Sequence, residues 1–131
     1  MRYLLDVNVL LALQIAAHEH HGLAEAWVET LSERDEVLLS AWVEMGFVRV
    51  ALAARYLPDV PMARRGLHGF KAARAKVAFV ADDRRCTHLP AWVKSHAQVG
   101  DGHLVSLATA CDAILVTLDK GISGAKLIGP A

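Results

Sequence analysis

The feature that most constrains this chain is an almost continuous apolar run near its start, residues 2–13, which reads RYLLDVNVLLAL. Its apolar residues suit a buried strand that leads into a buried helix. Asp6 and Asn8 interrupt the run. An ionised carboxylate is costly to bury unless an opposite charge or hydrogen bonds compensate it. Helix capping alone explains Asp6 poorly, so we treat it as a candidate functional residue.

Composition indicates one globular domain spanning residues 1–131, because 54% of the chain is apolar and 21% is charged. The formal net charge is zero, so binding of nucleic acid would need a local basic patch or a bound metal ion. The two cysteines, Cys86 and Cys111, lie far apart and fit a reducing compartment. No stretch approaches the roughly 18 uninterrupted apolar residues of a membrane span. We therefore expect a cytoplasmic protein.

Short apolar runs alternate with helical patterns along the chain. The expected strands cover residues 3–7, 37–40, 77–81 and 113–117, with a short fifth at 126–128. The first expected helix begins near Val9. The others cover residues 20–32, 40–56 with Ser40 as N-cap, 61–76 and 101–111. Strands that are apolar on both faces and alternate with helices indicate a parallel sheet covered by helices. The fold class is α/β.

Several acids fall where such a sheet binds its ligands, at the carboxyl ends of the strands. Asp6 ends the first strand, Asp119 lies two residues beyond the fourth, and Glu44 lies one turn into the helix after the second. Asp101 begins a helix that leads back into the fourth strand, so it joins them only if the preceding segment carries it to that edge. Taken singly, Glu44, Asp101 and Asp119 could each serve a helix N-terminus instead.

Acids that converge on one crevice repel one another, and a divalent cation removes the conflict. An oxygen-rich site without Cys or His suits Mg²⁺ or Mn²⁺. Such a site can activate water for in-line displacement at phosphorus, with one ion or with two about 4 Å apart. Asn8 is placed to orient a carboxylate or a coordinated water.

Four segments together resemble the motifs of PIN-domain ribonucleases, in particular the VapC-type toxins of bacterial toxin–antitoxin pairs. The first is Leu5–Leu13 with Asp6, and the second is Ser40–Val50 with Glu44. The third is Gly100–Ala108 with Asp101, and the fourth is Leu115–Asp119 with Thr117 and Asp119. Each motif is weak alone, but the four occur in the family's order and the resemblance covers essentially the whole chain.

The resemblance implies a three-layer α/β/α domain with a central parallel sheet, and metal-dependent endonucleolytic cleavage of RNA. It implies that Asp6, Glu44, Asp101 and Asp119 bind Mg²⁺ or Mn²⁺, with Asn8 and Thr117 supporting them. It also implies a cognate antitoxin as partner and a homodimer. Two positions depart from the family pattern: Gly102 replaces the usual Ala after the third acid, and Ile122 replaces an aromatic residue. Neither removes an expected ligand.

Arginines on the central helices are candidate RNA contacts. Arg49 follows Glu44 on the same expected helix, and Arg64 and Arg65 belong to a basic, acid-free stretch. A solvated basic helix face explains that stretch equally well.

A phosphoacceptor binding module of the receiver type is the alternative, because it too carries an acidic Mg²⁺ pocket at its strand ends. It requires paired acids after the first strand, an Asp after the third and a Lys after the fifth. Asp82, Asp83 and Lys120 match that pattern only in part.

Overall fold

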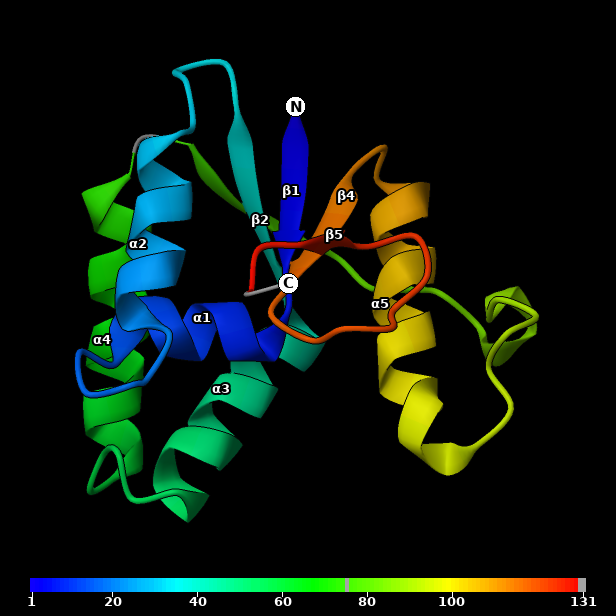
Figure 1. Cartoon of the computed structure of the whole chain (residues 1–131). Coiled ribbons are helices and arrows are strands. Elements are labelled where there is room, and N and C mark those ends of the chain that lie inside the picture. Colours follow the sequence, from blue (N-terminus) through cyan, green and yellow to red (C-terminus); the bar gives the residue numbers. More distant parts are fainter. Residues whose placement is uncertain (75, 130–131) are drawn as a thin grey trace.

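The structure, a computed structural model, describes residues 1–74 and 76–129. Its centre is a five-stranded parallel sheet with the strand order β3-β2-β1-β4-β5. The strands are β1 (Arg2–Leu5), β2 (Glu36–Ser40), β3 (Val77–Val80), β4 (Ile114–Thr117) and β5 (Lys126–Leu127). Figure 1 shows the sheet between two layers of helices. This is the three-layer α/β/α arrangement expected from the sequence.

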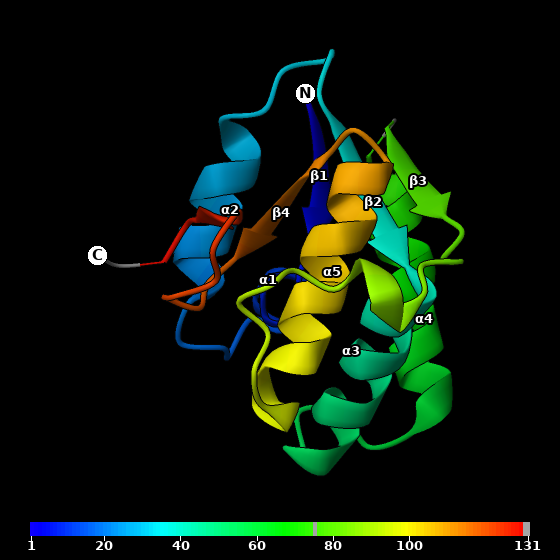
Figure 2. The same ribbon diagram turned by 90° about the vertical axis from the view of Figure 1, so that its right-hand side faces the viewer.

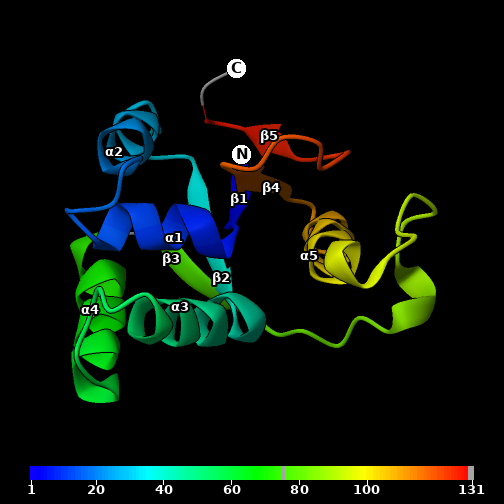
Figure 3. The same ribbon diagram turned by 60° about the horizontal axis from the view of Figure 1, so that its bottom comes forward.

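Five α-helices of the described residues cover the sheet. They are α1 (Val7–Gln14), α2 (His21–Glu29), α3 (Ala41–Ala53), α4 (Val60–Ala73) and α5 (Val99–Ala110). Crossovers between parallel strands are almost always right-handed, so the connections β1-β2 and β2-β3, which run in one direction, put α1 to α4 on one face. The connection from β3 to β4 runs back across the sheet and puts α5 on the other face. Figure 3 shows α5 apart from the other four helices.

The core fills the space between the sheet and these helices. Leu4, Leu38 and Leu115 lie side by side on β1, β2 and β4, and all three are fully buried. Phe47 of α3 and Leu104 of α5 pack from the helical layers and are buried as well. The sheet is therefore covered on both faces, as the apolar strands predict.

The boundary between the first strand and the first helix differs from the prediction. The strand was expected to reach Val7 and the helix to begin near Val9, whereas β1 ends at Leu5 and α1 begins at Val7. Asp6 is the cause, because its Oδ1 accepts a hydrogen bond of 2.7 Å from the Val7 N–H and so caps the helix. Ser40 caps α3 as predicted, its Oγ accepting from the Val43 N–H.

A long connection, residues 81–98, brings the start of α5 to the carboxyl edge of the sheet (Figure 2). It contains two short 3₁₀ helices, η1 (Cys86–His88) and η2 (His96–Gln98). Ser95 and Gln98 form a capping box at η2, and Gln98 Oε1 also accepts from the Lys94 N–H at 2.7 Å. The connection thereby provides the displacement that Asp101 needs to join the other acids. Among the described residues, no helix is both long and apolar enough to cross a membrane.

Candidate active site

The candidate site lies where the strand order of the sheet reverses. Successive strands run outwards from β1 through β2 to β3, and the chain then returns to place β4 on the other side of β1. In open α/β sheets, ligands bind at this reversal, outside the carboxyl ends of the strands. Asp6 follows β1 directly, and Asp119 lies two residues beyond β4. Topology therefore brings two of the predicted acids to the same crevice.

Three of the four predicted acids form one cluster. Asp6, Asp101 and Asp119 each offer a carboxylate oxygen, and these atoms lie within 4.8 Å of one another. Asp6 is buried, Asp101 is partly buried in the first turn of α5, and Asp119 is exposed. The cluster thus runs from the interior of the domain to its surface.

Hydrogen bonds fix the Asp6 carboxylate at the base of the cluster. Its Oδ1 accepts from the Val7 N–H, and its Oδ2 accepts from the Thr117 hydroxyl at 2.8 Å. The Asp6 N–H donates to the Val116 carbonyl at 2.9 Å, which continues the pairing of β1 with β4. The carboxylate is therefore held from two elements that are distant in sequence.

Thr117 and Asn8, the two expected supporting residues, link these elements. The Thr117 hydroxyl oxygen accepts from the Asp119 N–H at 3.0 Å and from the Asn8 side-chain amide at 3.4 Å. Asn8 Oδ1 in turn accepts from the Leu118 N–H at 3.2 Å. These contacts fix the backbone between Thr117 and Asp119, and with it the direction from which Asp119 approaches Asp6.

The cluster is electrostatically strained. Burial raises the pKa of Asp6 to about 6, against the lowering effect of the hydrogen bonds from Thr117 and Val7, and the charges of Asp101 and Asp119 raise it further. Burial and the neighbouring Asp119 also raise the pKa of Asp101. Raised pKa values mean that the protein alone stabilises these negative charges poorly.

The donor set fits a hard divalent cation. It consists of carboxylate oxygens at short mutual separation, with no cysteine or histidine in the cluster. Mg²⁺ and Mn²⁺ prefer such ligands, and a positive ion would remove the repulsion that raises the two pKa values. Asp6, Asp101 and Asp119 are the residues that could hold it.

The structure does not bring Glu44 into this cluster. Glu44 lies in the first turn of α3, and its Oε2 is 2.9 Å from the Lys71 ammonium of α4. Lys71 also lies over the Phe79 ring, with 5.9 Å between its nitrogen and the ring centroid. Helical spacing places Glu44 on α3 but does not indicate which way its side chain turns, and Lys71 is 27 positions away. We find no signal in the sequence for this pairing.

The three predicted RNA-contacting arginines occupy different places. Arg49 and Arg64 line a mostly apolar hollow of about 570 Å³ between α3 and α4, together with Glu44. Arg65 is exposed on α4. Arg49 also lines a second hollow, together with Trp42 and Asp82. Trp42 was not among the candidate residues predicted from the sequence. Trp42, Met45 and Arg49 stand at i, i+3 and i+7, a periodicity that could have identified this exposed stripe.

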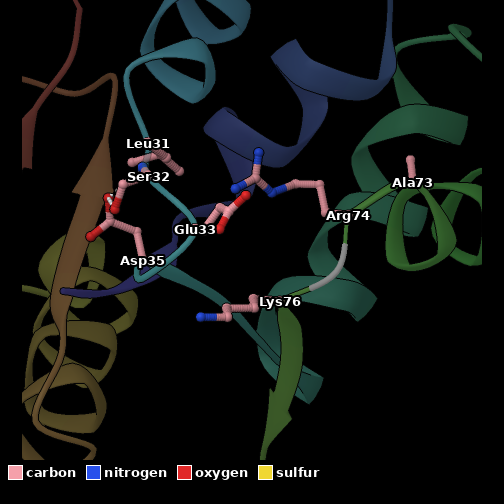
Figure 4. Close-up of a pocket in the computed structure, with 7 residues that line it drawn as sticks. All are labelled: Leu31, Ser32, Glu33, Asp35, Ala73, Arg74 and Lys76. Carbon is pink, nitrogen blue, oxygen red and sulfur yellow. Dashed lines mark hydrogen bonds between the residues drawn. The ribbon is translucent and has the colours of Figure 1, made fainter.

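A further hollow, of about 470 Å³, lies where β2 and β3 begin, at the opposite edge of the sheet (Figure 4). Charged residues of both signs line it, and Glu33 and Arg74 point towards one another there. Asp35 holds the loop before β2, since it accepts from the N-terminal ammonium at 3.0 Å and from the Ser32 N–H at 2.8 Å. These contacts are structural, and we assign this hollow no function.

Comparisons with known proteins agree with this fold. The family model for the PIN domain matches residues 3–126. Ribonuclease VapC44 of Mycobacterium tuberculosis is 34% identical over an alignment 134 positions long, which covers 94% of this chain and 89% of the relative. Ribonuclease VapC38 of the same organism is 34% identical over 128 residues, covering 91% and 86%.

Solved structures share the fold at lower sequence identity. VapBC2 from Rickettsia felis, bound to a DNA fragment from its promoter, aligns with a TM-score of 0.65 at 18% identity, and the alignment covers 97% of both chains. VapC20 of Mycobacterium tuberculosis, a toxin that cleaves the sarcin-ricin loop, aligns with a TM-score of 0.62 at 13% identity over 92% of both chains.

Fold and site together define an open parallel α/β domain with a carboxylate cluster at its topological switch point. The chain belongs to the PIN domain family. This membership speaks against the receiver-type alternative. That alternative also needs Asp82 in the acidic pocket, whereas Asp82 is hydrogen-bonded to His103 and lies outside the cluster.

Proposed function

We propose that this protein is a metal-dependent endoribonuclease and the toxin of a toxin–antitoxin pair. The cluster of Asp6, Asp101 and Asp119 at the switch point of a PIN domain carries the proposal. The names of the relatives, ribonucleases of the VapC type, support RNA as the substrate. The VapBC2 structure supports an antitoxin as the partner. We place the activity in the cytoplasm, where the RNA is, and expect a homodimer.

In this proposal, Asp6, Asp101 and Asp119 hold Mg²⁺ or Mn²⁺. When bound, the ion supplies Lewis-acid activation of water and neutralises charge at the phosphate. The residues of the chain orient the site: Thr117 and Val7 fix the two oxygens of Asp6, and Asn8 fixes the backbone that carries Asp119. The burial and mutual repulsion that raise the pKa values of Asp6 and Asp101 also favour ion binding, because the ion offsets the unfavourable negative charge.

Glu44 is the fourth proposed acid of the site. Its ion pair with Lys71 holds it on the side of α4, so its participation requires release from that lysine. Arg49, Arg64 and Arg65 are the proposed contacts to the RNA backbone, because a neutral chain needs local positive charge to hold a polyanion.

Cleavage of a labelled single-stranded RNA tests the proposal. The wild-type protein should cleave it in Mg²⁺ or Mn²⁺ and not in EDTA. Asp6→Asn should bring cleavage below detection, because Asn lacks the charge that binds the ion. Thr117→Val should lower activity by about 10- to 100-fold, the usual effect of removing a residue that orients a metal ligand.

Asp112→Asn is the matched control. Asp112 is an exposed acid beyond the C-terminal end of α5, with a φ of 54° that Asn also tolerates. This variant should cleave like the wild type. Full activity of Asp6→Asn, or cleavage that persists in EDTA, would refute the metal-dependent mechanism. Stable aspartyl phosphate after incubation with acetyl phosphate, without RNA cleavage, would favour the receiver-type module.

A further inference from the structure

A half-exposed tryptophan lies beside the carboxylate cluster. Trp42 is the second residue of α3, and 48% of its surface is exposed. Its ring lies against the first turn of α5, where a Cβ on Gly100 would come within 3.3 Å of Trp42 Cζ2. Gly100 immediately precedes Asp101, a member of the cluster. The indole therefore spans the two helical layers next to the candidate site.

Two further residues hold the indole in place. The His103 ring packs against it at 5.5 Å between centroids, and His103 Nε2 is hydrogen-bonded to Asp82 Oδ2. Asp82 Oδ1 accepts from the Arg84 N–H at 3.1 Å. His103 stands two residues after Asp101, so it leaves α5 in a different direction, towards Trp42. It supports the tryptophan and does not belong to the carboxylate cluster.

The exposed side of Trp42 borders a surface hollow of about 450 Å³. Its lining combines the indole with apolar atoms, one cation and one carboxylate; the residues are Ala41, Trp42, Met45, Gly46, Arg49 and Asp82. An aromatic wall with an arginine nearby is the combination by which proteins bind single-stranded nucleic acid, the ring stacking on a base and the cation attracting a phosphate.

We propose that Trp42 is a stacking platform for one unpaired RNA base next to the phosphate that is cleaved, with Arg49 contacting the backbone. This inference rests on the proposed ribonuclease function. Neighbouring strands lie about 4.8 Å apart, and β2, which leads into Trp42, pairs directly with β1, which leads into Asp6. A strand of RNA with one phosphate at the cluster therefore carries an adjacent nucleotide over the end of β2.

The platform defines a substrate class. A base within a continuous duplex is already stacked on its neighbours, so Trp42 can bind only a base in a single strand, a loop or a bulge. Stacking on an aromatic ring depends little on which base is present. Trp42 thus selects unpaired RNA without selecting a particular base.

Binding of fluorescently labelled RNA, followed by anisotropy in EDTA, separates this role from cleavage. Trp42→Ala should weaken binding of a short single strand by about tenfold, within the range known for loss of one base–aromatic stack. Trp42→Phe should restore most of the affinity. Tyr56→Ala is the matched control, since Tyr56 is another exposed aromatic residue, 39% exposed, beyond the far end of α3. It should bind like the wild type.

The outcomes distinguish this inference from the proposed function. Wild-type cleavage with unchanged RNA affinity in Trp42→Ala would overturn the platform alone, whereas a wild-type protein that neither binds nor cleaves RNA would overturn both. An equal loss of affinity for a blunt RNA duplex would also overturn the platform. So would a Trp42→Ala protein that binds RNA normally but no longer binds the proposed antitoxin, because Trp42 would then belong to a protein interface.

Discussion

Asp6 affects the stability of the fold in two opposite ways. As the N-cap of α1 it stabilises the fold by accepting from the Val7 N–H. Asp6 is also only 6% exposed and lies close to Asp101 and Asp119. Its negative charge therefore destabilises the protein in the absence of a cation, because it is buried and repelled by the neighbouring carboxylates. If stability alone mattered, Asn would be the better residue at this position, because it can cap the helix without bringing a charge into the interior.

Asp6→Asn should therefore stabilise the metal-free protein at neutral pH. The folded state raises the pKa of Asp6 from 3.8 to about 6, so the folded protein binds the proton more tightly than the unfolded chain does. The stability that Asp6 contributes is fully present below about pH 4 and is lost as the pH rises through about 6. In EDTA, the free energy of unfolding of Asp6→Asn relative to wild type should rise by about 2 kcal/mol across this window.

Urea unfolding of both proteins at a series of pH values provides this measurement. Saturating Mn²⁺ should reverse the order at neutral pH, because the ion stabilises only a protein that binds it. If the difference in free energy of unfolding between the two proteins did not change with pH, the raised pKa of Asp6 in the folded state would be contradicted.

At this scale, sequence reasoning reached the members of the cluster but not every contact. Asp6 and Asp119 could be predicted from the residues, because an acid that follows a strand has its position set by the backbone. Asp101 was expected there only from the family resemblance, since its place depends on the path of the connection 81–98. Glu44 has a longer side chain, and its direction depends on Lys71 of another helix. Trp42 escaped notice because its role depends on Gly100, His103 and Asp82, which only the folded chain brings near it.

At the level of the elements, the connection before α5 packs closely against the first turn of that helix at Gly102. The resemblance to the family motif led us to expect Ala at the position of Gly102, yet α5 is continuous from Val99 to Ala110. The space of the missing methyl group is taken by the loop before the helix, since a Cβ on Gly102 would lie 2.2 Å from Val93 Cγ2. Glycine at this position thus permits close packing of the connection that brings Asp101 to the site.

Gly102→Ala should consequently destabilise the protein by about 1–2 kcal/mol. A Cβ only 2.2 Å from Val93 Cγ2 should cost about 2–3 kcal/mol, the upper part of the usual range for overpacking. This cost outweighs the gain of about 1 kcal/mol that alanine brings within a helix. Adding Val93→Ala should recover part of the loss, because the side chain that clashes is then removed. Chemical unfolding of the single and double variants measures both effects.

Gly69→Ala is the control for helix propensity. Gly69 lies in α4, and a Cβ there would meet no atom of the described residues within 4 Å. This variant should gain about 0.5–1 kcal/mol. If Gly102→Ala stabilised the protein as much as Gly69→Ala, the packing account of α5 would be wrong.

Element types and order were accessible from the sequence, whereas exact boundaries were less so. The apolar runs predicted the five strands of the described sheet at nearly the right positions along the chain, but they did not predict the order of the strands in the sheet. The helix expected to reach residue 56 ends at Ala53, and the chain turns at Arg55, whose φ is 61°. No Gly or Asn marks this left-handed position, so composition gave no sign of it.

The domain as a whole derives its site from its topology. Asp6 and Asp119 are 113 residues apart in sequence but meet because β1 and β4 are neighbours at the point where strand order reverses. The long connection before α5 then adds Asp101 from the other helical layer (Figure 2). No single segment carries the candidate site, so its integrity depends on the folding of the complete sheet.

The position of a bound ion tests the central claim most directly. A crystal of the protein soaked in Mn²⁺ and measured near the manganese absorption edge should show an anomalous peak between the carboxylates of Asp6, Asp101 and Asp119. The same experiment on Asp6→Asn should show this peak lost or strongly reduced. A wild-type crystal with manganese bound only elsewhere, or with no peak at the cluster at saturating Mn²⁺, would contradict the assignment of these three residues as the metal centre.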